Sequence, residues 1–408
     1  MTALPPPVSA SDVVAARDLL DGVVRTTPMA GARALSALTG TAVHLKCENL
    51  QRTGSFKIRG AYTRIARLSE RERAGGVVAA SAGNHAQGVA LAAQLLGVRA
   101  TVFMPERAAL PKVDATRGYG AEVVLGGDTV DDAVVAAGEA SERTGAVLVH
   151  PFDHPDVVAG QGTVGLEILE QVPDVGTVLV SAGGGGLLGG VAAVLRERRP
   201  GVRIVGVQAA GAAAWPGSLA AGHPVRAGGM RTIADGIAVG RPGDVTFPQV
   251  SALIDEMVTV DEDMIARALV HCLERAKLVV EPAGAAAVAA LMENADRFGA
   301  TEGPVVAVLS GGNVDPLVLL QVIRHGLVAS SRYLALHVRV QDRPGALAEL
   351  LTQVGTLGAN VTDVAHSRIV GALPVGDVDV ELSLETRGPD HRDAIVAGLR
   401  AAGHTVGG

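Results

Sequence analysis

The order of apolar and polar residues divides the chain into two parts with different patterns. From about residue 42 to residue 206, short apolar runs alternate with amphipathic or Ala-rich stretches of helical length. The apolar runs predict strands at Val43–Cys47, Val77–Ala80, Arg99–Met104, Ala121–Leu125, Val147–His150, Val178–Ser181 and Ile204–Gln208. The stretches between them predict helices at Asn84–Leu96, Thr129–Thr144, Gly160–Gln171 and Gly186–Arg199. Strand–helix–strand repetition predicts an α/β architecture with open parallel sheets.

The same pattern continues past residue 206 and then changes after about Gly326. Helices are predicted at Asp261–Ala276 and Gly284–Met292, and a strand at Val305–Ser310. In the tail, alternation predicts strands at Tyr333–Val340, Asn360–His366 and Val378–Glu385, helices at Ala346–Leu357 and Asp390–Ala402, and a short final strand. The order β-α-β-β-α-β is that of a ferredoxin-like domain. We therefore expect a large α/β domain followed by a small one.

Composition limits the classes of function that the chain can have. Hydrophobic residues make up 48% of the chain and aromatic residues 2%, which suits parallel sheets built of small aliphatic side chains. The net charge is −7 and no basic block occurs, which argues against nucleic-acid binding. Residues 1–9 lack the pattern of a signal peptide, no apolar run is long enough to span a membrane, and Cys47 and Cys272 show no metal-ligand spacing. We expect a soluble cytoplasmic protein.

The segment Ser55–Gly60 places Lys57 between Phe56 and Ile58, in a stretch of low charge. Lysine usually lies on a solvated surface, and apolar neighbours lower its pKa so that it becomes a nucleophile or a base. Lysine is also the side chain that forms Schiff bases with carbonyls, above all with pyridoxal phosphate. The alternative is a lysine at the start of an amphipathic helix with no chemical role. The segment alone does not decide between the two.

A second segment, Ser81–Gly88, follows an apolar run and opens a predicted helix. Its small residues let a ligand approach the main chain, and the free N–H groups at a helix start bind anions such as a carboxylate. Asn84 fits a helix cap as well as a hydrogen bond to a cofactor oxygen, and the two roles are compatible. His85, taken alone, favours a structural role over a catalytic one.

Two glycine-rich turns follow later strands. Gly183–Gly186 are four consecutive glycines, a nest of main-chain donors suited to a phosphate, although a flexible turn is the alternative. Neither a Walker motif nor a dinucleotide-binding fingerprint is present, which leaves other phosphate-bearing cofactors. Ser310–Asn313 also ends an apolar strand. Ser310 can offer its hydroxyl to a ring nitrogen or simply cap the strand.

Taken in this order, Ser55–Gly60, Ser81–Gly88, Gly183–Leu187 and Ser310–Asn313 resemble segments of the fold-type II pyridoxal-phosphate enzymes, and more narrowly of the threonine/serine dehydratases (threonine ammonia-lyases). Thr232–Val239 and Val280–Ala285 resemble the same family, and the resemblance covers roughly residues 26–328. The tail resembles, through residues 342–347, an ACT domain, which is a small amino-acid-binding module. The resemblance implies a catalytic domain at residues 1–328 with two open parallel-sheet subdomains, the smaller one inserted at about residues 45–155. A linker at residues 329–332 and a regulatory domain at residues 333–408 follow.

The resemblance also implies a role for individual residues. Lys57 forms the Schiff base with pyridoxal 5'-phosphate and then takes the α-proton of the substrate. Ser310 faces the pyridine nitrogen, and a serine there leaves that nitrogen unprotonated, which favours prompt β-elimination over slower carbanion chemistry. The other cofactor-binding residues are Phe56, Asn84, Gly183, Gly184, Gly185, Gly186, Leu187 and Glu281. The substrate carboxylate binds Ser81, Gly83, Asn84 and His85.

Two departures from related proteins narrow these expectations. Serine racemases carry a second serine where this chain has Ala82, so we expect little conversion of L-serine to D-serine. Many relatives bind a divalent cation through Glu and Asp at positions that align here with Gln208 and Ala214. Neutral Gln and Ala are poor ligands for Mg²⁺ or Ca²⁺, so no metal site is expected.

The sequence therefore predicts a pyridoxal-phosphate-dependent enzyme that converts L-threonine to 2-oxobutanoate and ammonia by β-elimination of water. A serine-preferring dehydratase is one alternative, and a catalytically inactive, amino-acid-binding regulatory protein is another. In the tail, Asp342 and Asn360 are predicted contacts of a branched-chain effector such as isoleucine, as expected if the reaction opens isoleucine synthesis. A dimerisation role is the alternative for the tail. The resemblance implies a homotetramer or homodimer.

Overall fold

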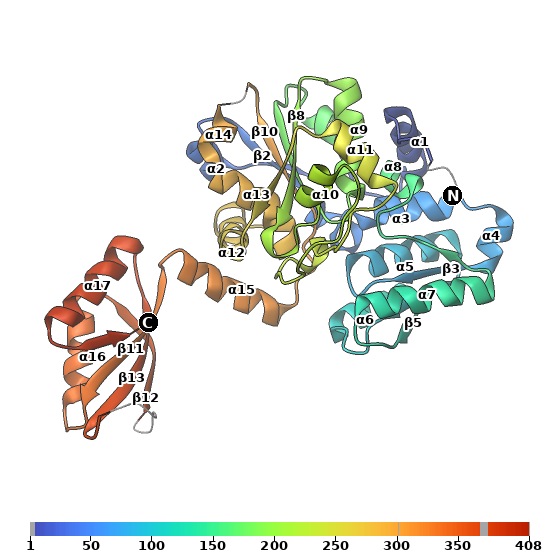
Figure 1. Cartoon of the computed structure of the whole chain (residues 1–408). Helices are drawn as coiled ribbons and strands as arrows, with labels where there is room; N and C mark the ends of the chain where they lie inside the picture. The colour runs from blue at the N-terminus through green and yellow to red at the C-terminus, as the bar shows by residue number, and fades with distance from the viewer. Residues whose placement is uncertain (1–4, 301, 368–373, 408) are drawn as a thin grey trace. The chain divides into compact units, whose positions relative to one another are not determined.

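The computed structural model describes residues 5–300, 302–367 and 374–407. The chain divides into two compact units, Met1–Leu319 and Leu320–Gly408. The division lies inside helix α15 (Pro316–Ala329), so Ala329, the first residue of the expected linker at residues 329–332, is helical. Figure 1 shows the order of the elements along the chain.

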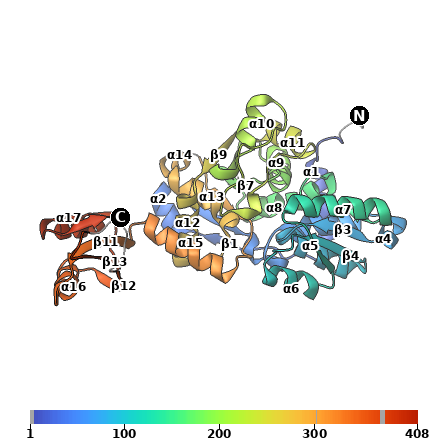
Figure 2. The ribbon, with the colours of Figure 1, turned by 60° about the horizontal axis from the view of Figure 1, so that its bottom comes forward.

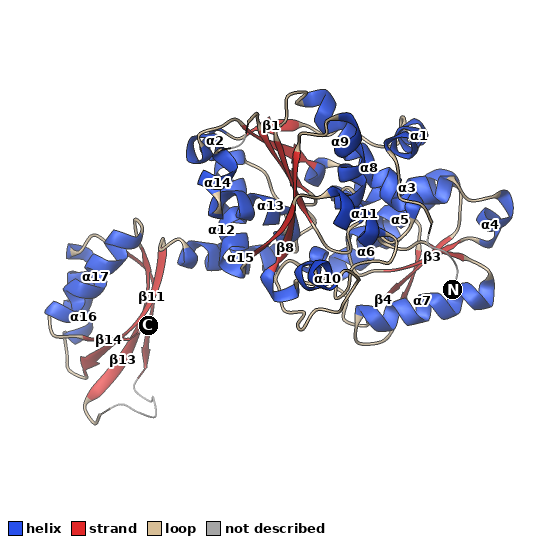
Figure 3. Cartoon of the chain, turned by 45° about the horizontal axis from the view of Figure 1, so that its top comes forward, coloured by secondary structure: helices blue, strands red, loops and turns tan. Residues whose placement is uncertain are grey.

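The larger sheet of the first unit has, within the described residues, six strands in the order β1-β2-β10-β7-β8-β9. Their bounds are Met29–Gly31 (β1), Val43–Cys47 (β2), Thr177–Ser181 (β7), Arg203–Ala209 (β8), Glu256–Val260 (β9) and Val305–Leu309 (β10). Strand β1 is antiparallel to β2, and the other pairs are parallel. Helices cover both faces of this sheet (Figure 3), and every residue of β7 and β10 is buried.

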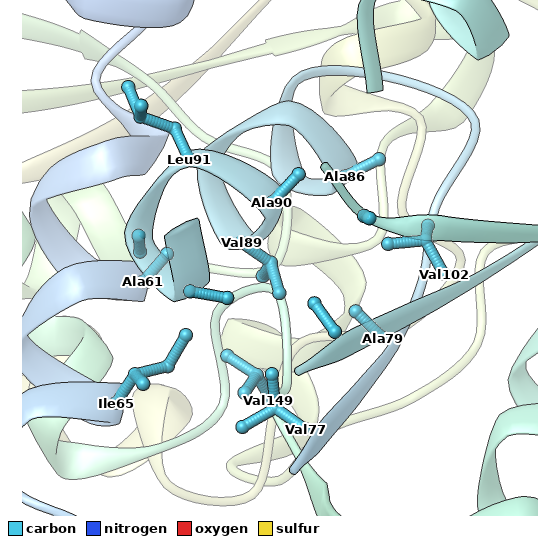
Figure 4. Close-up of a cluster of buried hydrophobic side chains, with 14 of the residues drawn as sticks. Ala61, Ile65, Val77, Ala79, Ala86, Val89, Ala90, Leu91, Val102 and Val149 are labelled. Carbon is cyan, nitrogen blue, oxygen red and sulfur yellow. The ribbon is translucent and has the colours of Figure 1, made fainter. Parts of the chain in front are cut away.

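The smaller sheet is parallel, and across residues 5–300 it contains four strands in the order β5-β4-β3-β6. Their bounds are Val77–Ala80 (β3), Ala100–Met104 (β4), Glu122–Leu125 (β5) and Val147–Leu148 (β6). Alternate residues of β3 enter different cores. Val77 and Ala79 pack with Val89 and Ile65, whereas Val78 and Ala80 pack with alanines of helix α7 (Val130–Thr144). Figure 4 shows the first of these clusters, and Figure 2 shows helices α4–α7 gathered around β3 and β4.

The helices of the first unit follow the predicted order, with additions that the sequence pattern did not indicate. The bounds of the helices from α1 to α14 are Ala10–Leu20, Arg33–Thr39, Lys57–Ala66, Glu70–Gly75, Asn84–Leu96, Leu110–Gly118, Val130–Thr144, Pro155–Gln171, Gly186–Arg198, Trp215–Ala221, Thr246–Leu253, Glu262–His271, Pro282–Glu293 and Ala295–Gly299. The helix expected over residues 261–276 ends at His271 and continues as a π-helical turn, Cys272–Ala276. The predicted α/β architecture with open parallel sheets is confirmed.

The second unit has the predicted ferredoxin-like order. Strands Tyr333–Gln341 (β11), Asn360–Ser367 (β12), Asp377–Glu385 (β13) and Thr405–Gly407 (β14) form an antiparallel sheet in the order β12-β13-β11-β14, and helices Ala346–Thr356 (α16) and Pro389–Ala401 (α17) lie between them in sequence. Leu336, Val338 and Val340 of β11 share a buried cluster with Leu350 and Ile395 of the two helices. One face of the sheet is therefore the core of this unit.

A buried network of four charged side chains fixes the helix that begins at Lys57. Nε and Nη2 of Arg59 donate to the two carboxylate oxygens of Glu48, each at 2.8 Å, and Nη1 lies 2.7 Å from Glu167. Nζ of Lys46 donates to the other Glu167 oxygen at 2.6 Å. None of the four side chains is more than 8% exposed. Two cations and two anions compensate one another, so the cluster joins β2, α3 and α8 without an unpaired charge.

We expect the Arg59→Met substitution to lower the free energy of unfolding by about 3–5 kcal/mol, because it leaves Glu48 and Glu167 buried with one cation between them. Arg17→Met is the matched control, since Arg17 and Glu170 form an exposed pair and their loss should cost less than about 1 kcal/mol. Urea unfolding followed by circular dichroism measures both values. Equal effects of the two substitutions would contradict a structural role for the buried network.

Candidate functional site

A cavity of about 1030 Å³ lies in the first unit, and the predicted site residues of that unit line it. They come from segments that follow different strands or begin helices: Phe56, Lys57, Ser81, Ala82, Gly83, Asn84, His85, Gly183, Gly184, Gly185, Gly186, Leu187, Glu281 and Ser310. Strands β3, β7 and β10 end at this cavity, as binding sites of open parallel sheets do. Residues far apart in the sequence therefore meet in one place.

Lys57 is the first residue of helix α3, and its side chain enters the cavity. Its Nζ donates to the carbonyl oxygen of Pro151 at 2.9 Å and lies 5.1 Å from the centre of the Phe56 ring. Burial lowers the pKa of Lys57 to about 8, and the Glu281 carboxyl only partly opposes this. A lysine with such a pKa has an appreciable neutral fraction near pH 7, which a nucleophile or base requires.

The Asn84 side chain is held in one orientation by a partner on each side. Its Nδ2 donates to Oε1 of Glu281 at 2.7 Å, and its Oδ1 accepts from Nδ2 of Asn313 at 2.8 Å. An amide has two donor hydrogens, so one hydrogen of Nδ2 is left after the bond to Glu281. Burial and the Asp235 carboxylate raise the pKa of Glu281 to about 7, although the bond from Asn84 lowers it. Asn313 belongs to a predicted motif, but its role as the second partner of Asn84 was not predicted.

The start of helix α5 offers free main-chain donors to the cavity. Gly83 is the N-cap residue and provides no side-chain cap, and Oγ of Ser81 accepts from the N–H of Gly83 at 3.1 Å. The first N–H groups of a helix of 13 residues are thus open to a carboxylate. The imidazole of His85 is not part of this group, because it is 4% exposed and its Nε2 lies 2.7 Å from the carbonyl oxygen of Val149. Of His85, only the main-chain N–H in the first turn of α5 is therefore left for the predicted contact with the substrate carboxylate.

The glycine run Gly183–Gly186 connects β7 to helix α9, and its carbonyl groups are held by other side chains. Nε1 of Trp215 donates to the Gly183 carbonyl at 2.7 Å, and Oγ1 of Thr246 donates to the Gly184 carbonyl at 2.5 Å. Gly185 has a φ of +102° and precedes α9, which has no side-chain cap. With these two carbonyls engaged, the N–H groups of the run and the start of α9 have the arrangement expected of an anion-binding nest.

Close packing of neighbouring aromatic side chains, and not only the approach of a ligand, requires glycine at two positions of this run. A Cβ at Gly184 would lie 2.3 Å from the Phe152 ring, and a Cβ at Gly185 would lie 2.6 Å from the Trp215 ring. Both distances are far below van der Waals contact. Substitution at either position would therefore push an aromatic side chain out of place and reshape the nest.

The residues fit pyridoxal phosphate by their donor chemistry. A lysine amine, a main-chain nest for a phosphate, and an asparagine beside a carboxyl line one cavity. Ser310, 4% exposed, ends β10 at the same cavity, and Oγ of Ser181, also at the cavity, is buried without a partner among the described residues. Unpartnered buried hydroxyls are rare in folded proteins, so the Ser181 hydroxyl is consistent with a polar ligand in this cavity.

Sequence reasoning missed the turn from His150 to Asp153. It supplies the carbonyl oxygen that accepts from Lys57, and the Phe152 ring that lies against Gly184. Asp153 accepts from the N–H groups of residues 244, 245 and 246 at 2.9–3.1 Å and so caps helix α11. The composition could have indicated that this turn matters, because aromatic residues are rare in the chain. It has five phenylalanines and one tryptophan, and Phe152 and Trp215 both lie against the glycine run.

Gln208 and Ala214 are the two positions at which the sequence predicts that no metal ion binds. Oε1 of Gln208 accepts from the main-chain N–H of Trp215 at 2.8 Å, and Ala214 is buried. Within the part of the chain that the structure describes, no group of three or more His, Cys, Asp or Glu side chains is arranged to hold a metal ion. The described residues also include no helix with the length and apolar character needed to cross a bilayer.

The two predicted effector contacts lie at opposite ends of the sheet of the second unit. Gln341, just before Asp342, pairs with the first residue of β13, whereas Asn360 pairs with its last residue, Glu385. A strand of nine residues places them about 27 Å apart. One copy of the unit therefore cannot bring both residues to one small ligand.

Comparisons with known proteins agree with this geometry. The family model described as "Pyridoxal-phosphate dependent enzyme" matches residues 20–311. L-threonine ammonia-lyase of Thermotoga maritima is 49% identical to this chain over 399 residues, which cover 98% of the chain and 99% of that protein.

Among solved structures, the processed form of threonine deaminase isoform 2 from Solanum lycopersicum superimposes with a TM-score of 0.74 at 38% identity, covering 79% of this chain and 96% of that one. Maize serine racemase gives a TM-score of 0.74 at 36% identity, covering 78% and 97%. These neighbours confirm the predicted fold-type II architecture. The lysine, the glycine nest and the family match together show that this chain belongs to the pyridoxal-phosphate-dependent enzymes.

Proposed function

We propose that this chain converts L-threonine to 2-oxobutanoate and ammonia by β-elimination of water. The observation that supports it most is a lysine with a lowered pKa in a cavity that also holds an uncapped helix start and a glycine nest. The identity of 49% with an L-threonine ammonia-lyase over nearly the whole chain supports the choice of substrate. Pyridoxal phosphate, when bound, supplies the electron-withdrawing ring that makes the Cα–H bond of an amino acid acidic.

Each part of the cavity has a task in this reaction. The nest at Gly183–Leu187 would hold the phosphate, Ser310 the ring nitrogen, and Asn84 the ring hydroxyl. The start of α5 at Gly83 would hold the α-carboxylate of the substrate. Nζ of Lys57, which donates to the Pro151 carbonyl in this structure, would bind the cofactor carbonyl. Once the substrate amine takes its place there, the freed neutral amine of Lys57 would accept the α-proton.

The opposite face of the ring lacks a second acid or base in this proposal. Ala82 lines the cavity where serine racemases carry a serine. A methyl group can neither deliver nor remove a proton, so reprotonation of Cα from that side has no donor at this residue. Elimination is therefore favoured over racemisation, even though maize serine racemase is a close structural neighbour.

Steady-state kinetics on L-threonine and L-serine test the proposal directly. We expect the holoenzyme to release 2-oxobutanoate from L-threonine with a higher kcat/KM than pyruvate from L-serine. The β-methyl group that separates the two substrates is worth about 1–3 kcal/mol, or roughly 10- to 200-fold. Lys57→Ala should abolish turnover and the visible absorbance of the bound cofactor. A preference for serine, or turnover by the Lys57→Ala protein, would refute the proposal.

The lowered pKa of Lys57 predicts how the cofactor-free protein takes up pyridoxal phosphate. Only the neutral amine attacks a carbonyl, so the rate of uptake rises with pH and levels off above the pKa of the amine. We expect the rate to level off above about pH 8, the pKa that burial gives Lys57. Stopped-flow absorbance at a series of pH values measures this. A rate that still rises above pH 10 would show an ordinary, solvated lysine.

We also propose that the second unit binds a branched-chain amino acid, isoleucine first, and that the protein is a homo-oligomer. The ferredoxin-like order of its elements supports a regulatory module. Because Asp342 and Asn360 lie at opposite ends of the sheet, an effector that contacts both would have to bind between two copies.

Titration of threonine turnover with isoleucine tests this second proposal. Isoleucine should inhibit the wild-type protein, and Asp342→Ala should raise the half-inhibitory concentration by about 5-fold or more, as expected when a coupling of 1 kcal/mol or more is lost. Leucine, which has the same composition and a different branch point, is the matched control ligand. Absence of inhibition by isoleucine in the wild-type protein would show that the unit has another role.

A further inference from the structure

His150 lines the cavity and has no role in the reaction as described so far. Its Nδ1 lies 2.8 Å from the main-chain nitrogen of Asp153 and 3.3 Å from that of Phe152. Main-chain N–H groups can only donate, so Nδ1 must be the acceptor and holds no proton. The turn that accepts from Lys57 therefore also fixes the tautomer of this imidazole.

The remaining ring nitrogen of His150 must then carry the proton. Burial lowers the pKa of His150 to about 4, the Asp153 carboxylate opposes this only in part, and Lys57 lowers it further. The ring is neutral near pH 7, with its hydrogen on Nε2. The hydrogen bonds among the described residues engage His150 only through Nδ1, so Nε2–H has no acceptor within that part of the chain.

A β-hydroxy amino acid has three polar groups, and two of them already have places in the cavity. Its amino group joins the cofactor in the proposed function, and its α-carboxylate lies at the start of α5. The third is the β-hydroxyl group, the group that leaves. His85 cannot serve it, because Nε2 of His85 is engaged at Val149.

We propose that His150 donates a hydrogen bond from Nε2 to the β-hydroxyl oxygen of the substrate and so positions the leaving group. This inference rests on the proposed function and names a contact that its other residues do not supply. The hydrogen bond strengthens as negative charge grows on the oxygen during cleavage of the Cβ–O bond.

The neutral imidazole positions the hydroxyl and does not supply its proton, because losing Nε2–H would leave an imidazolate anion. Lys57 supplies the proton that the departing hydroxyl group needs. Its Nζ takes the α-proton as the Cα–H bond breaks, and the same Nζ returns a proton to the oxygen as the Cβ–O bond breaks. One water molecule leaves, and both Lys57 and His150 end in the protonation states in which they began.

The His150→Asn variant separates this role from the structural one. The Oδ1 atom of an asparagine sits near the place of Nδ1 and can accept from Asp153, so the turn is kept, but the side chain does not reach the place of Nε2. We expect kcat/KM for L-threonine to fall by about 10- to 100-fold, the range between a hydrogen bond to a developing charge and an oxyanion-hole donor. With 3-chloro-L-alanine, whose chloride leaves without a hydrogen-bond donor, kcat/KM should stay within about 3-fold of wild type.

Two further variants complete the test. His150→Gln keeps a donor near the place of Nε2 and loses the acceptor of the turn, so it should retain a threonine-to-chloroalanine ratio closer to wild type than His150→Asn does. His154→Asn is the matched control, because Nδ1 of His154 also caps a main-chain N–H, that of Asp156, and His154 does not line the cavity. Its ratio should be unchanged.

The outcomes are distinct for this inference and for the proposed function. Equal losses on threonine and 3-chloro-L-alanine in His150→Asn, or no loss on threonine, would overturn the role of His150 while wild-type turnover still supports the proposed function. A wild-type protein that eliminates chloride from 3-chloro-L-alanine but no water from L-threonine would overturn the proposed function, and the inference with it.

Discussion

The turn from His150 to Asp153 is the constraint on which the rest of the site depends. Its Pro151 carbonyl accepts from Lys57, the Phe152 ring lies against Gly184, and Asp153 caps α11, whose Thr246 in turn holds the Gly184 carbonyl. One turn between the smaller sheet and α8 thus sets the position of the Lys57 amine and the shape of the glycine run. A shift of this turn would move both at once, because the interior is closely packed.

Two groups of buried titratable residues in the first unit differ in the partners that surround them. Around Arg59, each cation lies at hydrogen-bonding distance from a carboxylate, so the four buried side chains compensate one another. In the cavity, Lys57, Glu281 and His150 lack a full set of such partners, and burial moves the pKa of each toward the neutral form. The same low-polarity interior therefore holds a network of paired charges in one place and groups whose neutral form is favoured in another.

Features that depend on residues close together in the sequence could be predicted from the sequence alone. The apolar runs gave β2 and β3 with their observed bounds, and the glycine run and Lys57 stand where the local pattern indicated. Strand β1 was missed because it has three residues, and β9 because it begins with a glutamate at a sheet edge. Helices α10 and α11 were missed because each contains a proline within its first turn.

Long-range contacts could not be predicted in the same way. Lys57 and Pro151 are separated by 94 positions, and Asp153 caps a helix more than 90 positions away. No local spacing encodes such a contact. Conversely, His85 stands in a recognisable motif, yet its ring nitrogen Nε2 is hydrogen-bonded to the carbonyl oxygen of Val149, 64 positions away.

Trp215 is the one tryptophan of the chain, and its indole N–H is bound to the carbonyl of Gly183. Its ring is stacked on Phe247 with the ring centres 5.8 Å apart, and it is fully buried. All tryptophan fluorescence of this protein therefore arises from a single indole that touches the glycine run. The fluorescence of Trp215 therefore reports on the glycine run without background from any other tryptophan and without an added label.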